Sequence, residues 1–250
     1  MVPGTVTLLG HGRLGSALAE GWGLTGSLER LAILTRDDTP VCAGDTRVLV
    51  IAVKPAGWRA AVAPLAATLP STAVIVSVMA GVRAADLASA LPGRAVVRVM
   101  PTTAVAQGRG VAALWSADAS ALAMAHSLFD PIADTVDLDE EALIDAATAV
   151  AGSAPAFFYA LAQALAAAGV EAGLTPDAAA RLARGALRSA GAGAETGVTV
   201  DALIARIASP GGTTRAGLDA FQAAGLGAAA NAAVRAAVAR TKALAGDQPA

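Results

Sequence analysis

Short runs of β-branched and other apolar residues fill the first half of this chain and do not occur in the second half. Continuous apolar strands that alternate with helices are typical of a mostly parallel sheet covered by helices on both faces. The first half is therefore predicted to be an α/β domain. The expected strands are 5–9, 31–35, 47–53, 73–79, 95–100, 110–115 and 133–136, with helices ending near 22 and at about 56–69, 84–90 and 120–128.

From residue 139 the strand patterns give way to Ala-rich helical stretches. We therefore expect an α/β domain over 1–138 and an all-helical domain over 139–250. Ser153 and Thr175 each stand just before a proline-led helical run, which is typical of a helix N-cap followed by a proline in the first turn. The expected helices are 139–150, 154–169, 176–195, 200–208, 213–224 and 227–244.

The charge and the reactive residues exclude several classes of function. The net charge is -2, from 18 basic and 20 acidic residues, and no Lys/Arg cluster offers a surface for nucleic acid. With one cysteine and two histidines, the chain has too few ligands for a usual zinc site and no pair for an internal disulfide. We therefore expect neither a metal nor a nucleic-acid partner.

Apolar residues make up 55% of the chain, which indicates extensive buried surface that includes a subunit interface. The apolar run 142–170 is long enough to span a membrane, but Gly152 and Pro155 interrupt it. A helix that is apolar all round is more often buried in a core or an oligomer, so no membrane partner is expected. No basic segment precedes the first apolar run, so we expect no signal peptide and a cytoplasmic protein.

The run Gly10-His11-Gly12-Arg13-Leu14-Gly15 fits the pattern G-x-G-x-x-G between a predicted strand and a predicted helix. In that setting the first glycine permits a tight turn, the second lets a pyrophosphate approach the backbone, and the third lets helix and strand pack closely. The helix start then offers free N–H groups to the phosphates. This run therefore predicts a dinucleotide-binding site, whereas a glycine-rich turn without a ligand is the simpler alternative.

The end of the second strand bears on the choice of cofactor. A basic residue at this position accommodates the 2′-phosphate of NADP, and an acidic residue binds the free ribose hydroxyls of NAD. Thr35 and Arg36 favour NADP(H), while Asp37 could hold a free ribose diol. We expect NADP(H) to be preferred over NAD(H), with Arg36 as a solvated loop charge the other interpretation.

Several motifs then follow in a familiar order. The chain reads GHGRLGSALAEG, VLVIAVKP, VIVSVMAGV, VVRVMP, AVAGSAPAFFYALAQALAAAGVEAGL and SPGGTTRAGL. Over nearly its whole length it resembles the pyrroline-5-carboxylate reductases, and SPGGTT and AGSAPAF are the specific motifs. The resemblance implies an N-terminal Rossmann-like NAD(P)-binding domain and an all-α C-terminal dimerisation domain. It also implies reduction of the cyclic imine Δ1-pyrroline-5-carboxylate to L-proline by hydride transfer from NAD(P)H.

SPGGTT, residues 209–214, is then interpreted as the substrate site. Gly211, Gly212, Thr213 and Thr214 would present uncommitted N–H groups at a helix start, where a substrate carboxylate can bind. The resemblance places the hydroxyl of Thr214 beside the ring nitrogen, in a catalytic role. The alternative is a plain N-cap by Ser209 or Thr213.

Other matches to the family pattern are less specific. By resemblance, Ser153 opens the helix that faces the substrate, although an ordinary N-cap is at least as good an explanation. Further cofactor contacts are expected where later strands end at the carboxyl edge of the sheet. These contacts are Val53, Lys54, Pro55, Met79, Ala80, Met100 and Thr102.

Three departures from the family pattern put the activity in question. Thr102 stands where the family usually has an asparagine, and Val198, Ile204 and Ala205 lie where charged residues are common. The segment 36–46 is too short for a full crossover helix, so we expect a loop and a more open adenine pocket.

These departures leave three alternatives open. The chain could be a paralogue that reduces another cyclic imine acid, or a non-catalytic NAD(P)-binding protein. It could also be a β-hydroxyacid dehydrogenase, a family that resembles this plan but uses a lysine of the second domain. Here the only lysine in that half is Lys242, near the chain end.

Overall fold

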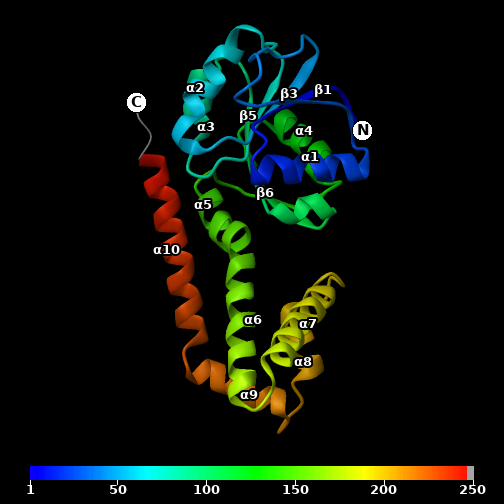
Figure 1. The fold of residues 1–250 in the computed structure, drawn as a ribbon. Coiled ribbons are helices and arrows are strands. Elements are labelled where there is room, and N and C mark those ends of the chain that lie inside the picture. The colour runs from blue at the N-terminus through cyan, green and yellow to red at the C-terminus, as the bar shows by residue number, and fades with distance from the viewer. Residues whose placement is uncertain (247–250) are drawn as a thin grey trace. The chain divides into compact units, whose positions relative to one another are not determined.

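The computed structural model describes residues 1–246 (Figure 1). The chain forms two compact units, residues 1–152 together with the segment from residue 236, and residues 153–235. All seven strands lie in the first unit. The last of them ends at Asp137, and only helices follow in the described chain.

The first unit is built on one seven-stranded sheet in the order β2-β1-β3-β4-β5-β6-β7. Neighbouring strands are parallel except β5 and β6, which confirms the prediction of a mostly parallel sheet. The chain winds from β1 outward to β2 and then crosses to β3, so the winding direction changes between β1 and β3. The strands are β1 Val2–Leu9, β2 Leu28–Leu34, β3 Thr46–Ile51, β4 Val74–Ser77, β5 Val96–Pro101, β6 Gly110–Ser116 and β7 Ala133–Asp137.

Helices cover both faces of this sheet, as the apolar strands require. Alternate residues of β3 show the division, because Val48 and Val50 belong to one core cluster and Leu49 and Ile51 to the other. The first cluster includes residues of α1 and α4, and the second includes residues of α2 and α3. These helices are α1 Arg13–Thr25, α2 Trp58–Val62, α3 Ala84–Ala90 and α4 Ala119–Phe129.

The prediction of one continuous helix at 56–69 is wrong. Residues 55–67 form a 3-10 turn at Pro55–Gly57, the short helix α2, and a second 3-10 turn at Ala63–Ala67. Pro64 lies in the first turn of that last segment. Because proline has no N–H to donate, it cannot continue a preceding α-helix.

The structure confirms that the crossover between β2 and β3 is a loop. Residues 35–45 contain no helix, and Cys42 is buried there with its N–H donating to the Thr68 hydroxyl at 3.1 Å. This crossover therefore leaves the carboxyl end of β2 without a covering helix of its own.

The helix predicted at 139–150 is also shorter than expected. α5 spans Leu143–Ala147, a π-helix follows at Thr148–Ser153, and α6 begins directly at Ala154. Ser153 has helical dihedral angles (φ -94, ψ -31) and makes no side-chain capping hydrogen bond. Its interpretation as an N-cap is therefore wrong, because the helical backbone runs through it.

The second unit consists of helices joined by short turns and loops. Its helices are α6 Ala154–Glu171, α7 Pro176–Ala194, α8 Val200–Ile207, α9 Thr213–Ala223 and the first part of α10 Leu226–Gly246. Thr175 caps α7 as predicted, since its hydroxyl accepts from Ala178 N–H at 3.3 Å.

Large apolar side chains of α6 are exposed in the single chain. Phe158 is 57% exposed and Tyr159 is 65% exposed, and α6 has no fully buried residue. The helical run Leu143–Glu171 is long and apolar enough to cross a membrane by length and composition. A helix buried in a protein assembly meets the same description.

A buried ion pair joins three segments of the first unit. Arg98 on β5 is buried, and its Nη1 donates to Glu141 Oε1 at 3.2 Å. The same oxygen accepts from the N–H of Ala84, at the start of α3, at 2.7 Å. Within residues 1–246, Nε and Nη2 of Arg98 are buried without a hydrogen-bond partner. Glu141 is therefore the carboxylate that pairs with this buried arginine.

We expect Glu141→Ala to lower the free energy of unfolding by about 3–5 kcal/mol, because it leaves the Arg98 charge buried and unpaired. Adding Arg98→Met removes that charge, so the double variant should unfold at a higher urea concentration than the single variant. Equal or lower stability of the double variant in urea titrations would contradict this account of the pair.

Candidate functional site

The glycine loop after β1 has the geometry that its sequence pattern predicts. Gly10 has φ +100, a conformation that glycine adopts without strain, and an added Cβ would lie 2.8 Å from the carbonyl oxygen of Ala52. An added Cβ at Gly15 would overlap the carbonyl oxygen of Gly10. Helix α1 therefore packs onto the turn at a distance that only glycine allows.

Gly12 differs from Gly10 and Gly15, because an added Cβ at Gly12 would meet no atom within 4 Å. It is the N-cap of α1, which has no side-chain cap, and the first helical bond runs from Ser16 N–H to Gly12 C=O at 2.8 Å. His11 and Arg13 are exposed, and Leu14 is half-buried. The open space at Gly12 and the uncapped helix start fit a pyrophosphate.

A cavity of about 390 Å³ lies beside this loop at the carboxyl ends of β1, β2 and β3. It brings together four of the predicted cofactor residues, Gly10, Thr35, Arg36 and Val53. Strand β1 lies between β2 and β3, so the cavity adjoins the point where the winding direction changes, where open α/β sheets bind ligands. Its remaining lining residues are Leu9, Leu34, Asp38, Pro40, Ala60, Ala61 and Pro64.

Sequence reasoning missed this second set. The predicted continuous helix at 56–69 gave no reason to single out Ala60, Ala61 and Pro64. Asp38 could have been identified from its position. It lies three residues after Thr35 in a crossover too short for a helix, where an acidic side chain often closes a turn.

The other predicted cofactor residues lie at the ends of β3, β4 and β5. Lys54 is exposed, Pro55 begins the 3-10 turn, and Ala80 is half-buried after β4. The side chains of Met79 and Met100 are packed in the core, at 3% and 6% exposure. Any contact that these two residues make with a cofactor must therefore come mainly from the backbone.

Thr102 is held by the neighbouring strand. Its N–H donates to Val111 C=O at 2.9 Å, and its hydroxyl oxygen accepts from Val111 N–H at 3.2 Å. Thr102 is also buried. The Thr102 hydroxyl thus helps to pair this segment with β6. The asparagine that the family usually has at this position would instead offer an amide side chain.

In the second unit, SPGGTT forms a turn that leads into α9. Gly212 N–H donates to Ser209 C=O at 3.0 Å, and Gly211 has φ +71. An added Cβ at Gly212 would lie 2.8 Å from Ser209 Oγ. The positive φ of Gly211 therefore favours glycine there, and the N–H of Gly212, which was expected to be uncommitted, is engaged within the turn.

Helix α9 begins with Gly212 as its N-cap and has no side-chain capping hydrogen bond. The interpretation of Ser209 or Thr213 as a plain N-cap is therefore wrong. Thr213 and Thr214 are exposed in the first turn, and the first helical bond runs from Ala216 N–H to Gly212 C=O at 3.1 Å. The α9 start thus presents open N–H groups beside two hydroxyls, which is a chemistry suited to a carboxylate.

Comparison with known proteins distinguishes between the families that the sequence left open. Over 240 residues the chain is 31% identical to the pyrroline-5-carboxylate reductase of Corynebacterium melassecola, covering 86% of this chain and 88% of that protein. The chain belongs to the pyrroline-5-carboxylate reductase family. The alternative of a β-hydroxyacid dehydrogenase is therefore set aside, and with it the reason to consider Lys242 as a catalytic lysine.

Further comparisons agree with the family. Residues 141–244 match the family pattern for pyrroline-5-carboxylate reductase dimerisation. The enzyme of Pseudomonas aeruginosa is 38% identical over 179 residues, covering 70% of this chain and 66% of that protein. The structure of the Coxiella burnetii enzyme superposes with a TM-score of 0.85 at 24% identity, covering 97% of this chain and 99% of that chain. That of the Plasmodium falciparum enzyme, which has NADP bound, gives a TM-score of 0.80 at 23% identity, covering 98% and 99%.

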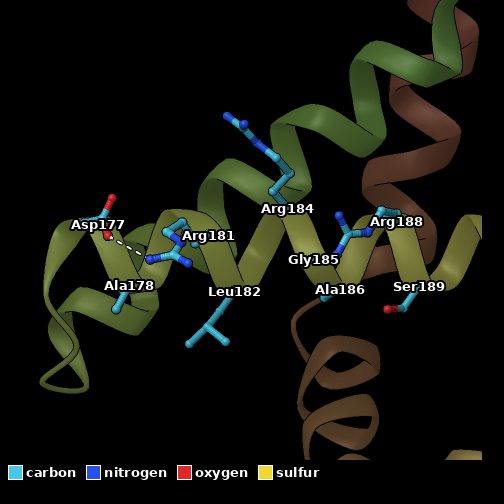
Figure 2. Close-up of a pocket in the computed structure, with 9 residues that line it drawn as sticks. All are labelled: Asp177, Ala178, Arg181, Leu182, Arg184, Gly185, Ala186, Arg188 and Ser189. Atoms are coloured by element: carbon cyan, nitrogen blue, oxygen red, sulfur yellow. Dashed lines mark ion pairs between the residues drawn. The ribbon is translucent and has the colours of Figure 1, made fainter.

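A larger cavity of about 770 Å³ lies along α7 (Figure 2). All of its lining residues come from this one helix, and Asp177 and Arg181 form an ion pair across one turn at 3.6 Å. Leu182 and Arg184 point to different sides of the helix in Figure 2. A groove with walls from a single helix does not enclose a small molecule, and none of the predicted site residues lines it.

We expect Gly12→Ala to weaken NADPH binding without lowering the thermal midpoint of unfolding. The added methyl group points into open space, so the fold tolerates it, but it blocks the approach of the pyrophosphate. Losing charge-assisted bonds worth about 1.5–3 kcal/mol corresponds to about ten- to a hundredfold in Kd. Titration of NADPH fluorescence measures this change.

Gly15→Ala is the matched comparison, because its Cβ would overlap the Gly10 carbonyl and should lower the melting temperature. Equal thermal destabilisation by both substitutions would contradict the separate roles of the two glycines.

Proposed function

We propose that this protein reduces Δ1-pyrroline-5-carboxylate to L-proline with a nicotinamide dinucleotide. The observation that carries the proposal is the uncapped, glycine-led start of α9 in a chain of this family. The glycine loop at α1 supports the cofactor part of the proposal independently of the family assignment.

The substrate carboxylate is the group that the α9 turn recognises. Backbone N–H groups of Thr213 and Thr214 follow the turn at Gly211 and Gly212, and the helix dipole adds partial positive charge at this end. No lysine or arginine is needed to hold the anion, which suits a chain with two lysines. Backbone amides also keep their donors at every pH at which the protein is folded.

The hydroxyl of Thr214 is assigned to the imine nitrogen. A nicotinamide cofactor held by the glycine loop at α1 would supply a hydride to the imine carbon, and the ring nitrogen would gain a proton as the double bond is reduced. Thr214 hydrogen-bonds this nitrogen, passes the proton to it and recovers one from solvent. Ser153, which makes no capping bond, is assigned to substrate binding.

The preference for NADP(H) over NAD(H) is proposed on Thr35 and Arg36 at the end of β2. Arg36 is exposed, lines the cavity and carries the charge that a 2′-phosphate requires. We assign residues 1–138 to cofactor binding and 139–250 to substrate binding and dimer formation, in a cytoplasmic enzyme. The remaining cofactor contacts are His11, Arg13, Leu14, Lys54, Pro55, Met79, Ala80, Met100 and Thr102.

One observation favours a second candidate, a paralogue that reduces a different cyclic imine acid. Thr102 has its backbone N–H and its hydroxyl oxygen engaged by Val111, so the polar surroundings of the nicotinamide would differ from those of an enzyme with an amide side chain there. Ring size is the property that such a change would alter.

The test is oxidation of NADPH, and then of NADH, at 340 nm with pyrroline-5-carboxylate and with its six-membered homologue in parallel. Turnover of the five-membered ring is the expected result. Activity on the larger ring alone would assign the paralogue, and binding of NADPH without turnover of either ring would overturn the proposal.

Thr214→Ala should lower kcat about a hundredfold, the lower end of a general acid–base contribution, with the Kd for NADPH unchanged. The substitution removes the proton donor and leaves the α9 backbone in place. Thr213→Ala is the matched comparison, because it removes the adjacent hydroxyl on the carboxylate side of the proposed site and should therefore raise KM more than it lowers kcat. Rates equal to wild type in Thr214→Ala would remove the proposed role.

We further propose a homodimer formed by the C-terminal helices. The match to the family dimerisation pattern, the exposed aromatic residues of α6 and the one-sided groove on α7 support it. A second chain would cover α6 and supply the missing wall of the groove.

The interface should be apolar and bury more than about 2,000 Å² in total, as obligate dimers do. Sedimentation velocity should therefore give a dimer at micromolar concentration, and Phe158→Asp should shift the distribution toward monomer. A wild-type protein that remains monomeric at that concentration would contradict the proposal.

A further inference from the structure

The short crossover after β2 folds back on the strand end through one carboxylate. Asp38 Oδ2 accepts from the N–H of Thr35 at 2.7 Å and from its hydroxyl, also at 2.7 Å. The N–H of Asp38 donates in turn to Thr35 C=O at 3.3 Å. These bonds close a tight turn over residues 35–38.

The carboxylate is an anion that stands inside the candidate cofactor cavity. Asp38 lines that cavity together with Gly10, Thr35 and Arg36. The two hydrogen bonds from Thr35 hold the pKa of the Asp38 carboxyl below its usual value, so the group is ionised at neutral pH. A fixed negative charge therefore lies where the carboxyl end of β2 meets the adenosine ribose of a bound dinucleotide.

The same donors are what a 2′-phosphate would use. A phosphate group at this strand end binds through N–H and O–H donors and a neighbouring cation. Thr35 provides both kinds of donor, and Asp38 already occupies them. Arg36 is exposed and forms no ion pair with Asp38 among the residues that the structure describes.

We propose that Asp38 is a specificity-determining residue that competes with the 2′-phosphate of NADP(H) for Thr35. It thereby limits the preference for NADP(H) that Arg36 sets, so that NAD(H) is also accepted. The free oxygen Oδ1 of Asp38 can accept from a ribose hydroxyl, which favours the cofactor without the phosphate. This inference rests on the proposed cofactor site.

The position of Asp38 argues against a structural role. Both Asp38 and Thr35 are exposed, so water can replace the carboxylate at the Thr35 donors when the side chain is shortened. No other side chain in the described chain is hydrogen-bonded to Asp38. Substitution is therefore expected to leave the fold intact and to change cofactor binding alone.

The experiment measures Kd for NADPH and NADH by cofactor fluorescence, without substrate, in the wild type, Asp38→Ala and Asp38→Asn. Asp38→Ala frees both Thr35 donors and removes a charge, and NADPH binding should tighten about tenfold, which lies between the effect of one charge pair in bulk water and that of a pair near a protein surface. NADH binding should be unchanged or weaker. Asp38→Asn removes the charge but keeps an acceptor oxygen, so its effect on NADPH should be smaller.

Asp134→Asn is the matched control, because it removes the same charge from β7 at the opposite edge of the sheet. Each of the following results would overturn the inference: NADPH affinity unchanged in Asp38→Ala, equal tightening of NADH, or a tenfold effect of Asp134→Asn. A shift in selectivity with Asp37→Asn and not with Asp38→Ala would transfer the role to Asp37 and overturn it as well.

The readout separates this inference from the proposed function. A wild type that binds both cofactors but turns over neither cyclic imine would refute the proposed reaction, and the effect of Asp38 would still be measured. A wild type that binds neither cofactor would refute both.

Discussion

Helix starts without a side-chain cap are the constraint on which both candidate sites depend. The first turn of a helix leaves N–H groups without backbone acceptors, and a Ser, Thr, Asp or Asn side chain usually satisfies one of them. Asp118, Thr175 and Thr199 do so at α4, α7 and α8. At α1 and α9 a glycine occupies the N-cap position and no side chain accepts, as also at α2, a five-residue helix that directly follows a 3-10 turn. The amides at the starts of α1 and α9 thus remain available to an anion, and in each case the residues before the helix shape the approach.

The α1 site also depends on how closely the helix approaches the sheet. Gly15 brings α1 against the Gly10 carbonyl, and Gly10 in turn has no room for a side chain beside Ala52 at the end of β3. Placing β1 between β2 and β3 separates the loops that follow these strands, and the cavity lies at their ends. Cofactor recognition is therefore a consequence of strand order and glycine packing before any side chain contributes. Within the proposed cofactor site, we assign the choice between two dinucleotides that share the same pyrophosphate to side chains at the end of β2.

Much of this arrangement could be predicted from the sequence, because strand runs and the glycine loop are local patterns with a single structural solution. The loop at 36–46 was predictable from length alone. Pro64 stands inside the segment 56–69, where a proline indicates a break that the prediction of a continuous helix did not take into account. The π-helix before Ser153 carries no periodic signal, so a Ser-x-Pro pattern was misread as a cap. The bond between Asp38 and Thr35 depends on the conformation of a four-residue turn, which residue types alone do not specify.

The apolar content of the chain has two separate explanations. The first unit buries its apolar residues on the two faces of its sheet, where the large side chains are almost fully enclosed. The second unit leaves Phe157, Phe158 and Tyr159 exposed on a helix that is otherwise rich in alanine. Small residues let another helix approach closely, and exposed aromatics supply the area that makes such contact favourable. If a second chain covers α6, the stability of the second unit and its assembly are one concentration-dependent equilibrium. Because α9 belongs to the same unit, the proposed carboxylate site would be ordered by the contacts that hold the dimer together.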